Sequence, residues 1–264
     1  MNARVSRFTP VRGAADDPRG VLLAVGSAAS RPQASRVPTA AEIDALCTIT
    51  AAKLRPLADP DVLDRTLSVY AASLERHRRA GEINTLLRVT HFVSELAHEC
   101  GGFSKMFEDL TYRPARANAK FRNVKSDEQA TELLAADTTG EAFANVAYDG
   151  INGNNKPGDG YLYRGRGFIQ LTGRRNYADM STRLVNVCAD LVGSPDLAAE
   201  PDFAARAAVS FWTRRNINVA ADRDDVLAVS ELINGKKKNG EEPNGMADRR
   251  QLLVLAKAAF YPRP

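Results

Sequence analysis

Glu99 is the first residue whose type and position could support chemistry. It follows Leu96 by three residues and Phe92 by seven, so a helix here would place all three on one apolar stripe. Glu99 also stands near the end of that helix, where the helix dipole is negative. Burial and the dipole both disfavour the ionised carboxylate. A carboxylic acid that keeps its proton can protonate the leaving oxygen of a glycosidic bond. The alternative interpretation is that Glu99 only caps the helix end or forms an ion pair there.

Glu108 is a candidate partner for Glu99. It follows nine residues later, and on one unbroken helix the two side chains would lie on opposite faces. The double glycine at 101–102 should break the helix, so the chain can turn and bring Glu108 back toward Glu99. Carboxyl groups about 6.5–9.5 Å apart leave room for a water, which is the inverting arrangement. Glu95 and Asp109 compete for the same roles, and spacing alone does not exclude them.

The sequence supports metal or thiol chemistry less than it supports carboxylate chemistry. The run His98-Glu99-Cys100 has no second ligand at the spacing of a helical zinc motif, and adjacent helical side chains point in different directions. The three cysteines, at positions 47, 100 and 188, form no CxxC pair and are odd in number. They therefore predict neither a disulfide scaffold nor a zinc site. We expect no metal and no cofactor.

The segment 149–173 is irregular and rich in glycine, with seven glycines in 25 residues. A loop of this length inside a compact domain is usually functional or disordered, and the interleaved aromatic and aliphatic residues favour an ordered loop. Gly165-Arg-Gly167 lacks the third glycine of a dinucleotide fingerprint, and no Gly-Lys-Ser/Thr follows. The sequence therefore does not support a nucleotide site.

The elements that must position these residues are helices. A capping box at Thr39–Glu42 opens the first helix, Asp59-Pro60 predicts the start of a second, and a third begins near Asn84 and ends at 101–102. Further helical patterns cover roughly 127–149, 175–192, 202–216, 223–233 and 245–260. No stretch alternates like a well-formed strand for more than a few residues. The sequence predicts a mainly α fold.

Length and charge separate a terminal segment from the rest. The 264 residues, 44% of them hydrophobic and 26% charged, are typical of a globular chain long enough for a substantial core, and no run is apolar enough for a membrane span. Residues 1–40 hold six arginines against two aspartates, which accounts for the whole formal charge of +4. We expect 1–38 to be a flexible basic arm that serves in secretion or targeting. Its apolar patch at 21–25 is short for a signal peptide and follows two aspartates.

Three motifs resemble those of a known family. They are Ala97-His-Glu-Cys-Gly-Gly-Phe103, Glu108-Asp-Leu-Thr-Tyr112 and Tyr163-Arg-Gly-Arg-Gly-Phe-Ile-Gln-Leu-Thr172, with further matches at 152–155, 157–160, 176–177, 233–235 and 247–249. In this order, over about residues 85–255, they resemble family 19 glycoside hydrolases, which comprise plant-type chitinases and a branch of phage and bacterial endolysins. The resemblance is strongest to the endolysin branch. It implies a lysozyme-like, two-lobed helical domain over 39–264, with the glycine-rich loop lining the cleft.

The resemblance also implies roles for individual residues. Glu99 matches the general acid, Glu108 the general base and Thr172 a hydroxyl that holds the attacking water. Cys100 stands where the family has Ser or Thr, and the disulfides of plant members have no evident counterpart. Family positions that line the sugar cleft, support it or tune the carboxylates fall on Tyr163, Arg166, Gln170, Asn176, Asn234 and Arg249.

The expected substrate is peptidoglycan. Residues 111–125 contain Arg113, Arg116, Lys120, Arg122 and Lys125 and no acid, so a basic lip beside Glu108 would favour an anionic wall polymer over neutral chitin. A solvated helix or loop face is the alternative for this stretch. We expect an inverting, muramidase-type, endolysin-like enzyme that cleaves β-1,4 bonds between N-acetyl sugars. A chitinase and a non-catalytic wall-binding protein are the competing hypotheses.

These expectations extend to partners and location. Residues 41–264 carry no net charge and contain no motif for nucleic-acid recognition, which argues against nucleic acid as a partner. We expect a monomer that does not insert stably into membranes. It would be made in the bacterial cytoplasm and act in the periplasm or cell wall, after release through a holin-type pore or secretion as an effector.

Overall fold

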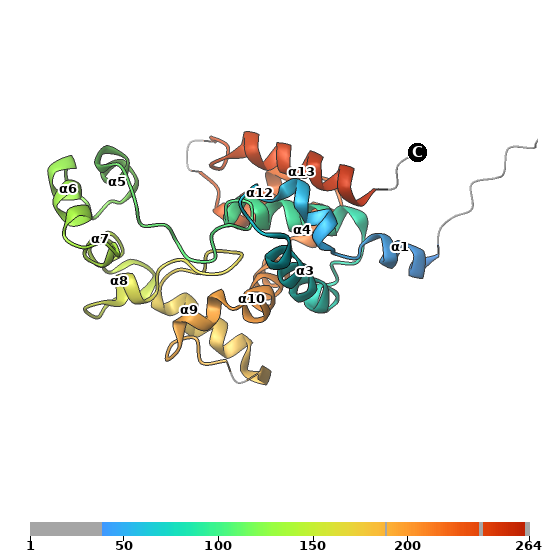
Figure 1. The fold of residues 1–264 in the computed structure, drawn as a ribbon, viewed down its shortest axis with the longest axis horizontal. Helices are drawn as coiled ribbons and strands as arrows, with labels where there is room; N and C mark the ends of the chain where they lie inside the picture. The colour runs from blue at the N-terminus through green and yellow to red at the C-terminus, as the bar shows by residue number, and fades with distance from the viewer. Residues whose placement is uncertain (1–38, 188, 238–239, 262–264) are drawn as a thin grey trace, which may run out of the picture. The chain divides into compact units, whose positions relative to one another are not determined.

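The computed structural model describes residues 39–187, 189–237 and 240–261 (Figure 1). The predicted basic arm at 1–38 lies outside the described residues. Within the described chain, helices dominate, and the β pairing consists of the isolated bridges Phe107–Arg166 and Arg166–Leu171. The predicted mainly α fold is confirmed.

A first helical group builds the main hydrophobic core. Helix α4 packs along α13, and the two run side by side in Figure 1. Helix α10 packs on α3, and Phe92 of α4 meets Trp212 of α10 edge to face at 5.3 Å. The group comprises α1 (Ala40–Leu46), α2 (Ala51–Leu54), η1 (Arg55–Leu57), α3 (Asp64–Arg78), η2 (Arg79–Gly81), α4 (Leu86–Glu99), α10 (Pro201–Arg214), α11 (Asn218–Ala221), α12 (Val226–Asn234) and α13 (Met246–Phe260).

A second helical group has a smaller, aromatic core of its own. Phe121 packs edge to face on Tyr112, Phe143 and Tyr148, with ring centroids 5.2–5.4 Å apart. This group comprises α5 (Pro114–Lys120), α6 (Asp127–Ala135), α7 (Glu141–Ala147) and α8 (Asp159–Leu162), whereas the short helix η3 (Ile151–Gly153) packs on α9 (Arg174–Arg183).

The remaining elements form a third cluster beside α10. It contains the buried tyrosines Tyr163 and Tyr177, whose ring centroids lie 5.2 Å apart. Helix α9 (Arg174–Arg183) and the short helices η4 (Val185–Val187) and η5 (Pro195–Ala199) belong to it. The loop between α8 and α9 therefore runs between helices that belong to different clusters.

The start of α1 is as predicted. The Thr39 side chain accepts from the Glu42 backbone N–H, and the Glu42 carboxylate accepts from the Thr39 backbone N–H at 2.7 Å. This reciprocal pair is the capping box expected from the sequence. Helix α4 also starts close to its predicted position, with Thr85 as the N-cap that accepts from Arg88 N–H.

The predicted start of the second helix at Asp59-Pro60 is wrong. Asp59 instead closes a separate turn, because its side chain accepts from Asp61 N–H at 2.9 Å and its carbonyl accepts from Val62 N–H. Its own N–H donates to the Gly102 carbonyl at 2.9 Å. Asp59 thus ties this turn to the end of α4, and α3 begins only at Asp64.

Two long predicted helices are divided. The pattern at 127–149 contains α6 and α7, separated by a turn in which Asp137 accepts from the N–H groups of Glu141 and Ala142 and Gly140 has φ +74°. Asp137 and the left-handed Gly140 therefore start a new helix at a place where apolar spacing alone would continue the first one. The pattern at 175–192 ends early, at Arg183. Among the described residues, no helix is both long and apolar enough to cross a membrane.

His91 of α4 is a buried titratable group in the core. The ring is fully buried, its Nε2 lies 2.8 Å from Asp224 Oδ1, and Nδ1 has no partner among the described residues. Burial lowers the pKa of His91, although Asp224 opposes this effect. Protonation at Nδ1 would bury an N–H group without an acceptor.

We expect the free energy of unfolding to fall as the pH is lowered below about 6.5, the ordinary pKa of histidine. The unfolded chain binds a proton there before the folded chain does, so the stability present above that pH is lost on acidification. Chemical denaturation between pH 7.5 and 5 measures this slope. His91→Gln should remove the part due to this ring, and an unchanged slope in that variant would contradict the assignment.

Candidate active site

The end of α4 positions Glu99. Gly101 and Gly102 both have positive φ, and Gly102 N–H donates to the Ala97 carbonyl at 2.7 Å, so the helix ends at Glu99, with Cys100 as its C-cap. A Cβ at Gly102 would lie 2.5 Å from the backbone N of Asp59. Glycine is thus required both for the turn and for the close approach of the neighbouring backbone.

Arg249 holds the Glu99 carboxylate. The arginine lies on α13 and is 1% exposed, and its Nη2 is 2.5 Å from Glu99 Oε1. Its Nη1 pairs with Glu95, one turn earlier on α4, which is also buried. Glu95 in turn accepts from the Ser230 hydroxyl of α12 at 2.9 Å. One buried guanidinium therefore serves two carboxyl groups.

This network contains two carboxyl groups and one cation. Burial raises the pKa of Glu95, although Arg249 and Ser230 act in the opposite direction. Two acids share one base, so the trio carries a net negative charge when both are ionised and none when one is protonated. Glu95 is the buried member of the pair, whereas about a fifth of the Glu99 side chain is exposed.

The loop before α9 positions Glu108. Its backbone N–H donates to the Gly165 carbonyl at 2.9 Å, next to the bridge that pairs Phe107 with Arg166. Gly165 N–H donates back to Glu108 Oε2 at 3.0 Å. The glycine-rich loop therefore holds both the backbone and the carboxylate of Glu108.

Two tyrosines complete the surroundings of Glu108. Oε1 accepts from the Tyr148 hydroxyl at 2.5 Å and from the Tyr112 hydroxyl at 3.4 Å. Burial raises the pKa of both tyrosines, and the Glu108 carboxylate raises it further, so both hydroxyls keep their protons. A carboxylate has about four acceptor positions. Three are occupied here, which leaves one on Oε2 for a water.

The two glutamates line one hollow of about 350 Å³. They come from different elements, Glu99 from α4 and Glu108 from the extended segment that follows it. Thr172 and Gln170 reach the same hollow from the glycine-rich loop, and the Thr172 hydroxyl donates to the Gln170 carbonyl at 2.8 Å. The other lining residues are Lys105, Asp109, Tyr112, Lys120 and Tyr148.

Asn176 and Asn234 do not line this hollow. Asn176 donates to the Thr172 carbonyl at 2.8 Å and lines an adjoining hollow of about 240 Å³ that also contains Thr172 and Gln170. Asn234 is exposed at the end of α12.

Tyr163 and Arg166 lie beneath the loop surface. Tyr163 is 1% exposed, and its hydroxyl donates to the Val192 carbonyl at 3.1 Å. Arg166 is 2% exposed, pairs with Asp196 at 2.7 Å and donates to the Tyr177 hydroxyl. Burial prevents both from touching a polymer directly, so they support the loop rather than bind the substrate.

Sequence patterns do not reveal the two tyrosines that hold Glu108. Tyr112 lies in a family-like motif that gives no sign of its role, and Tyr148 stands in a helical pattern where it resembles a core residue. Lys120 is visible in the sequence only as part of the basic stretch. It lies in the hollow, donates to the Tyr112 hydroxyl at 2.8 Å and stacks over that ring. Lys105 also lines the hollow, half exposed.

Thiol chemistry is excluded at Cys100. The residue is fully buried, its thiol donates to the Leu96 carbonyl at 3.0 Å, and burial raises its pKa to about 12. A thiol that remains protonated is neither a nucleophile nor a good metal ligand. Among the described residues, no three histidine, cysteine or acidic side chains gather as metal ligands would.

Gly165→Ala should reduce hydrolysis about ten- to a hundred-fold, because small displacements of reacting groups have effects of this size. The new methyl carbon would lie 2.8 Å from Gln170 Oε1 and 3.3 Å from both Glu108 Cβ and Thr172 Oγ1. Initial rates on the purified polymer measure this effect, with thermal denaturation as the measure of folding.

Gly150→Ala is the matched control for this change. Its Cβ would meet nothing within 4 Å, but its φ of +66° disfavours alanine. This variant should lose stability and keep its rate per folded molecule. Equal rates in the two variants would argue against crowding at Gly165.

Comparison with known proteins identifies the family of the chain. No protein-family model matches the chain. A glycosyl hydrolase family 19 domain-containing protein of Haemophilus influenzae is 32% identical over 174 residues, which is 63% of this chain and 80% of that relative. The chain belongs to glycoside hydrolase family 19. The predicted family is therefore confirmed. Family 19 membership makes the chain a glycoside hydrolase, for which a polysaccharide is the expected substrate.

Proposed function

We propose that this family 19 chain is an endolysin-like glycosidase of the muramidase type that cleaves β-1,4 bonds in peptidoglycan. The observation that carries the proposal is the shared hollow of Glu99 and Glu108, in which each carboxyl group has a different environment. Glu99 belongs to the trio with Arg249 and Glu95, whereas Glu108 accepts from three donors. Two carboxyl groups in unlike surroundings suit an acid and a base.

The proposed reaction is a single displacement with inversion. Glu99 gives its proton to the glycosidic oxygen as the bond between that oxygen and the anomeric carbon breaks. Glu108 takes a proton from the water that attacks the opposite face of the sugar, through its free Oε2 position. The Thr172 hydroxyl donates to the Gln170 carbonyl, so its oxygen lone pairs can accept from the same water and orient it.

Positive charge around the hollow favours an anionic polymer. Lys105 and Lys120 line the hollow itself, and Lys105 pairs there with Asp109 at 3.5 Å. Arg113, Arg116 and Arg122, on and around α5, are exposed. Peptidoglycan carries carboxylates on its lactyl-peptide stems, and chitin is neutral. Electrostatic attraction would therefore raise the local concentration of peptidoglycan over that of chitin.

Mass spectrometry of the digestion products tests this function. Purified peptidoglycan should yield muropeptides with a reducing N-acetylmuramic acid end, and NMR of fresh products should show the inverted anomer. A reducing N-acetylglucosamine end would keep the wall-degrading function but replace the muramidase type. Release of sugars from chitin oligomers alone would favour a chitinase, and no product from either polymer would favour a wall-binding protein.

Such an enzyme must cross the cytoplasmic membrane to reach its substrate. We propose that a holin-type pore or a secretion machine provides the route, and that the chain acts as a monomer. Lysis of producing cells only when a holin is co-expressed would support the first route. Lysis without a holin would count against it.

A further inference from the structure

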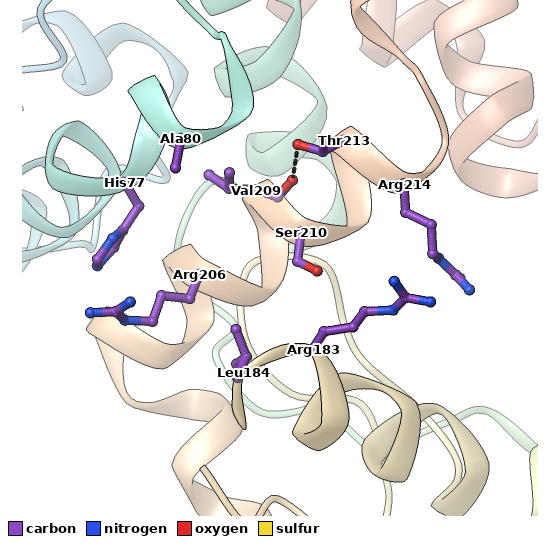
Figure 2. Close-up of a pocket in the computed structure, with 9 residues that line it drawn as sticks. All are labelled: His77, Ala80, Arg183, Leu184, Arg206, Val209, Ser210, Thr213 and Arg214. Atoms are coloured by element: carbon purple, nitrogen blue, oxygen red, sulfur yellow. Dashed lines mark hydrogen bonds between the residues drawn. The ribbon is translucent and has the colours of Figure 1, made fainter. Parts of the chain in front are cut away.

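A second hollow, of about 480 Å³, lies between α3, α9 and α10 and is rich in cationic side chains. Figure 2 shows Arg183 from α9 and Arg206 and Arg214 from α10 around it, with His77 of α3 at one end. Ser210 lies between the arginines and adds a hydroxyl. None of these groups takes part in the reaction proposed above.

Each end of this arginine hollow has more positive than negative charge. Arg183 and Arg214 both pair with Asp179, at 3.1 and 3.3 Å. At the other end, Arg206 pairs with Asp202 at 2.9 Å, and the same carboxylate also holds Arg76 and His77. Two carboxylates thus serve four guanidinium groups and an imidazole.

Each of the three arginines has N–H donors that its ion pair does not use. A guanidinium has five N–H donors in a planar fork that fits a carboxylate. Arg214 uses one Nη in its contact with Asp179, and Arg206 uses Nε with Asp202. The three side chains are 31–42% exposed, so an incoming anion can reach them at little cost in desolvation.

The arginine hollow connects with the active site through shared lining residues. Gln170 and Thr172 line both the catalytic hollow and the adjoining hollow of about 240 Å³. Arg214 lines that adjoining hollow and the arginine hollow. A substrate branch that leaves the glycan chain beside Thr172 can therefore follow the surface to the arginines.

We propose that the arginine hollow binds the carboxylates of the peptide stems of peptidoglycan while the glycan backbone occupies the catalytic hollow. This inference rests on the proposed function. An extended stem of five residues spans about 16 Å, at about 3.3 Å per residue. The stem has carboxylates on an acidic side chain and at its end, and the hollow offers one cationic cluster at each end. Chitin has no such branch.

The experiment compares two forms of the same polymer. The Arg183→Gln, Arg214→Gln double variant is assayed on peptidoglycan with intact stems and on glycan strands from which an amidase has removed the stems. We expect KM on stem-bearing polymer to rise at least ten-fold, with kcat on stripped strands within two-fold of the wild type. Arg65→Gln, at an exposed arginine near the start of α3, is the charge-matched control and should change neither value.

The outcomes separate this inference from the proposed function. Equal KM values for wild type and double variant on stem-bearing polymer would overturn the stem site, and so would equal losses on both polymers. If the wild type digests neither polymer, the proposed function fails. Calorimetric titration with a soluble stem peptide then still tests the site: the wild type should bind it and the double variant should not.

Discussion

Glu99→Gln should reduce the rate of hydrolysis by about three orders of magnitude and leave the fold intact. Glutamine has the size of glutamate and can still accept from Arg249, but it has no proton to give to a leaving oxygen. General acid catalysis contributes about 10²–10⁴-fold. The rate on purified polymer measures the loss. Glu132→Gln, on the exposed face of α6, is the matched control and should retain full activity.

An aryl glycoside of the same oligosaccharide, used as a substrate, distinguishes the catalytic roles of the two glutamates. A nitrophenolate leaving group departs without protonation, so Glu99→Gln should lose far less activity on it than on the natural polymer. Glu108→Gln should lose activity equally on both, because both reactions need an activated water. If Glu99→Gln lyses walls as fast as the wild type, Glu99 is not the acid.

Arg249→Met should destabilise the protein by about 3–5 kcal/mol, because it leaves the buried carboxyl group of Glu95 without its cation. It should also reduce activity, since Glu99 loses the group that fixes its carboxylate. Denaturant unfolding and initial rates measure the two effects. Arg250→Met, at the next residue of α13, removes an exposed arginine that pairs with Glu242 and should change neither substantially.

A double variant distinguishes positioning from folding. Adding Glu95→Met to Arg249→Met removes the uncompensated charge and should restore much of the stability. Activity should stay low, because Glu99 still lacks its partner. Recovery of activity together with stability would show that Arg249 acts only through the fold.

The sequence predicts helix positions well where caps and apolar spacing agree, as in α1 and α4. It is misleading at Asp59, which has the residue type of a helix cap. The partner that decides its role, the Gly102 carbonyl, lies 43 positions along the chain. Helices α6 and α7 are divided by Asp137, whose side chain accepts from two backbone N–H groups, and by Gly140, whose φ is positive. Neither feature is visible in the hydrophobic periodicity.

The candidate site could be predicted as a set of residues but not as a network. Family motifs pointed to Glu99, Glu108, Thr172 and Arg249. That Arg249 also holds Glu95 depends on the register between α4 and α13, which no local pattern encodes. The role of Tyr148 cannot be predicted for the same reason, because a tyrosine in a helical pattern has the spacing of a core residue whether or not its hydroxyl reaches a carboxylate.

The two glutamates depend on different hydrophobic cores. Glu99 stands on α4 in the main core, whereas the tyrosines that hold Glu108 pack with Phe121 and Phe143 in the smaller core of the second helical group. Parts of a protein with few buried apolar contacts can open locally without global unfolding. We therefore expect opening of the second helical group to set the fraction of catalytically competent molecules. A mutation that stabilises α4 or α13 would raise the melting temperature without raising the temperature at which activity disappears.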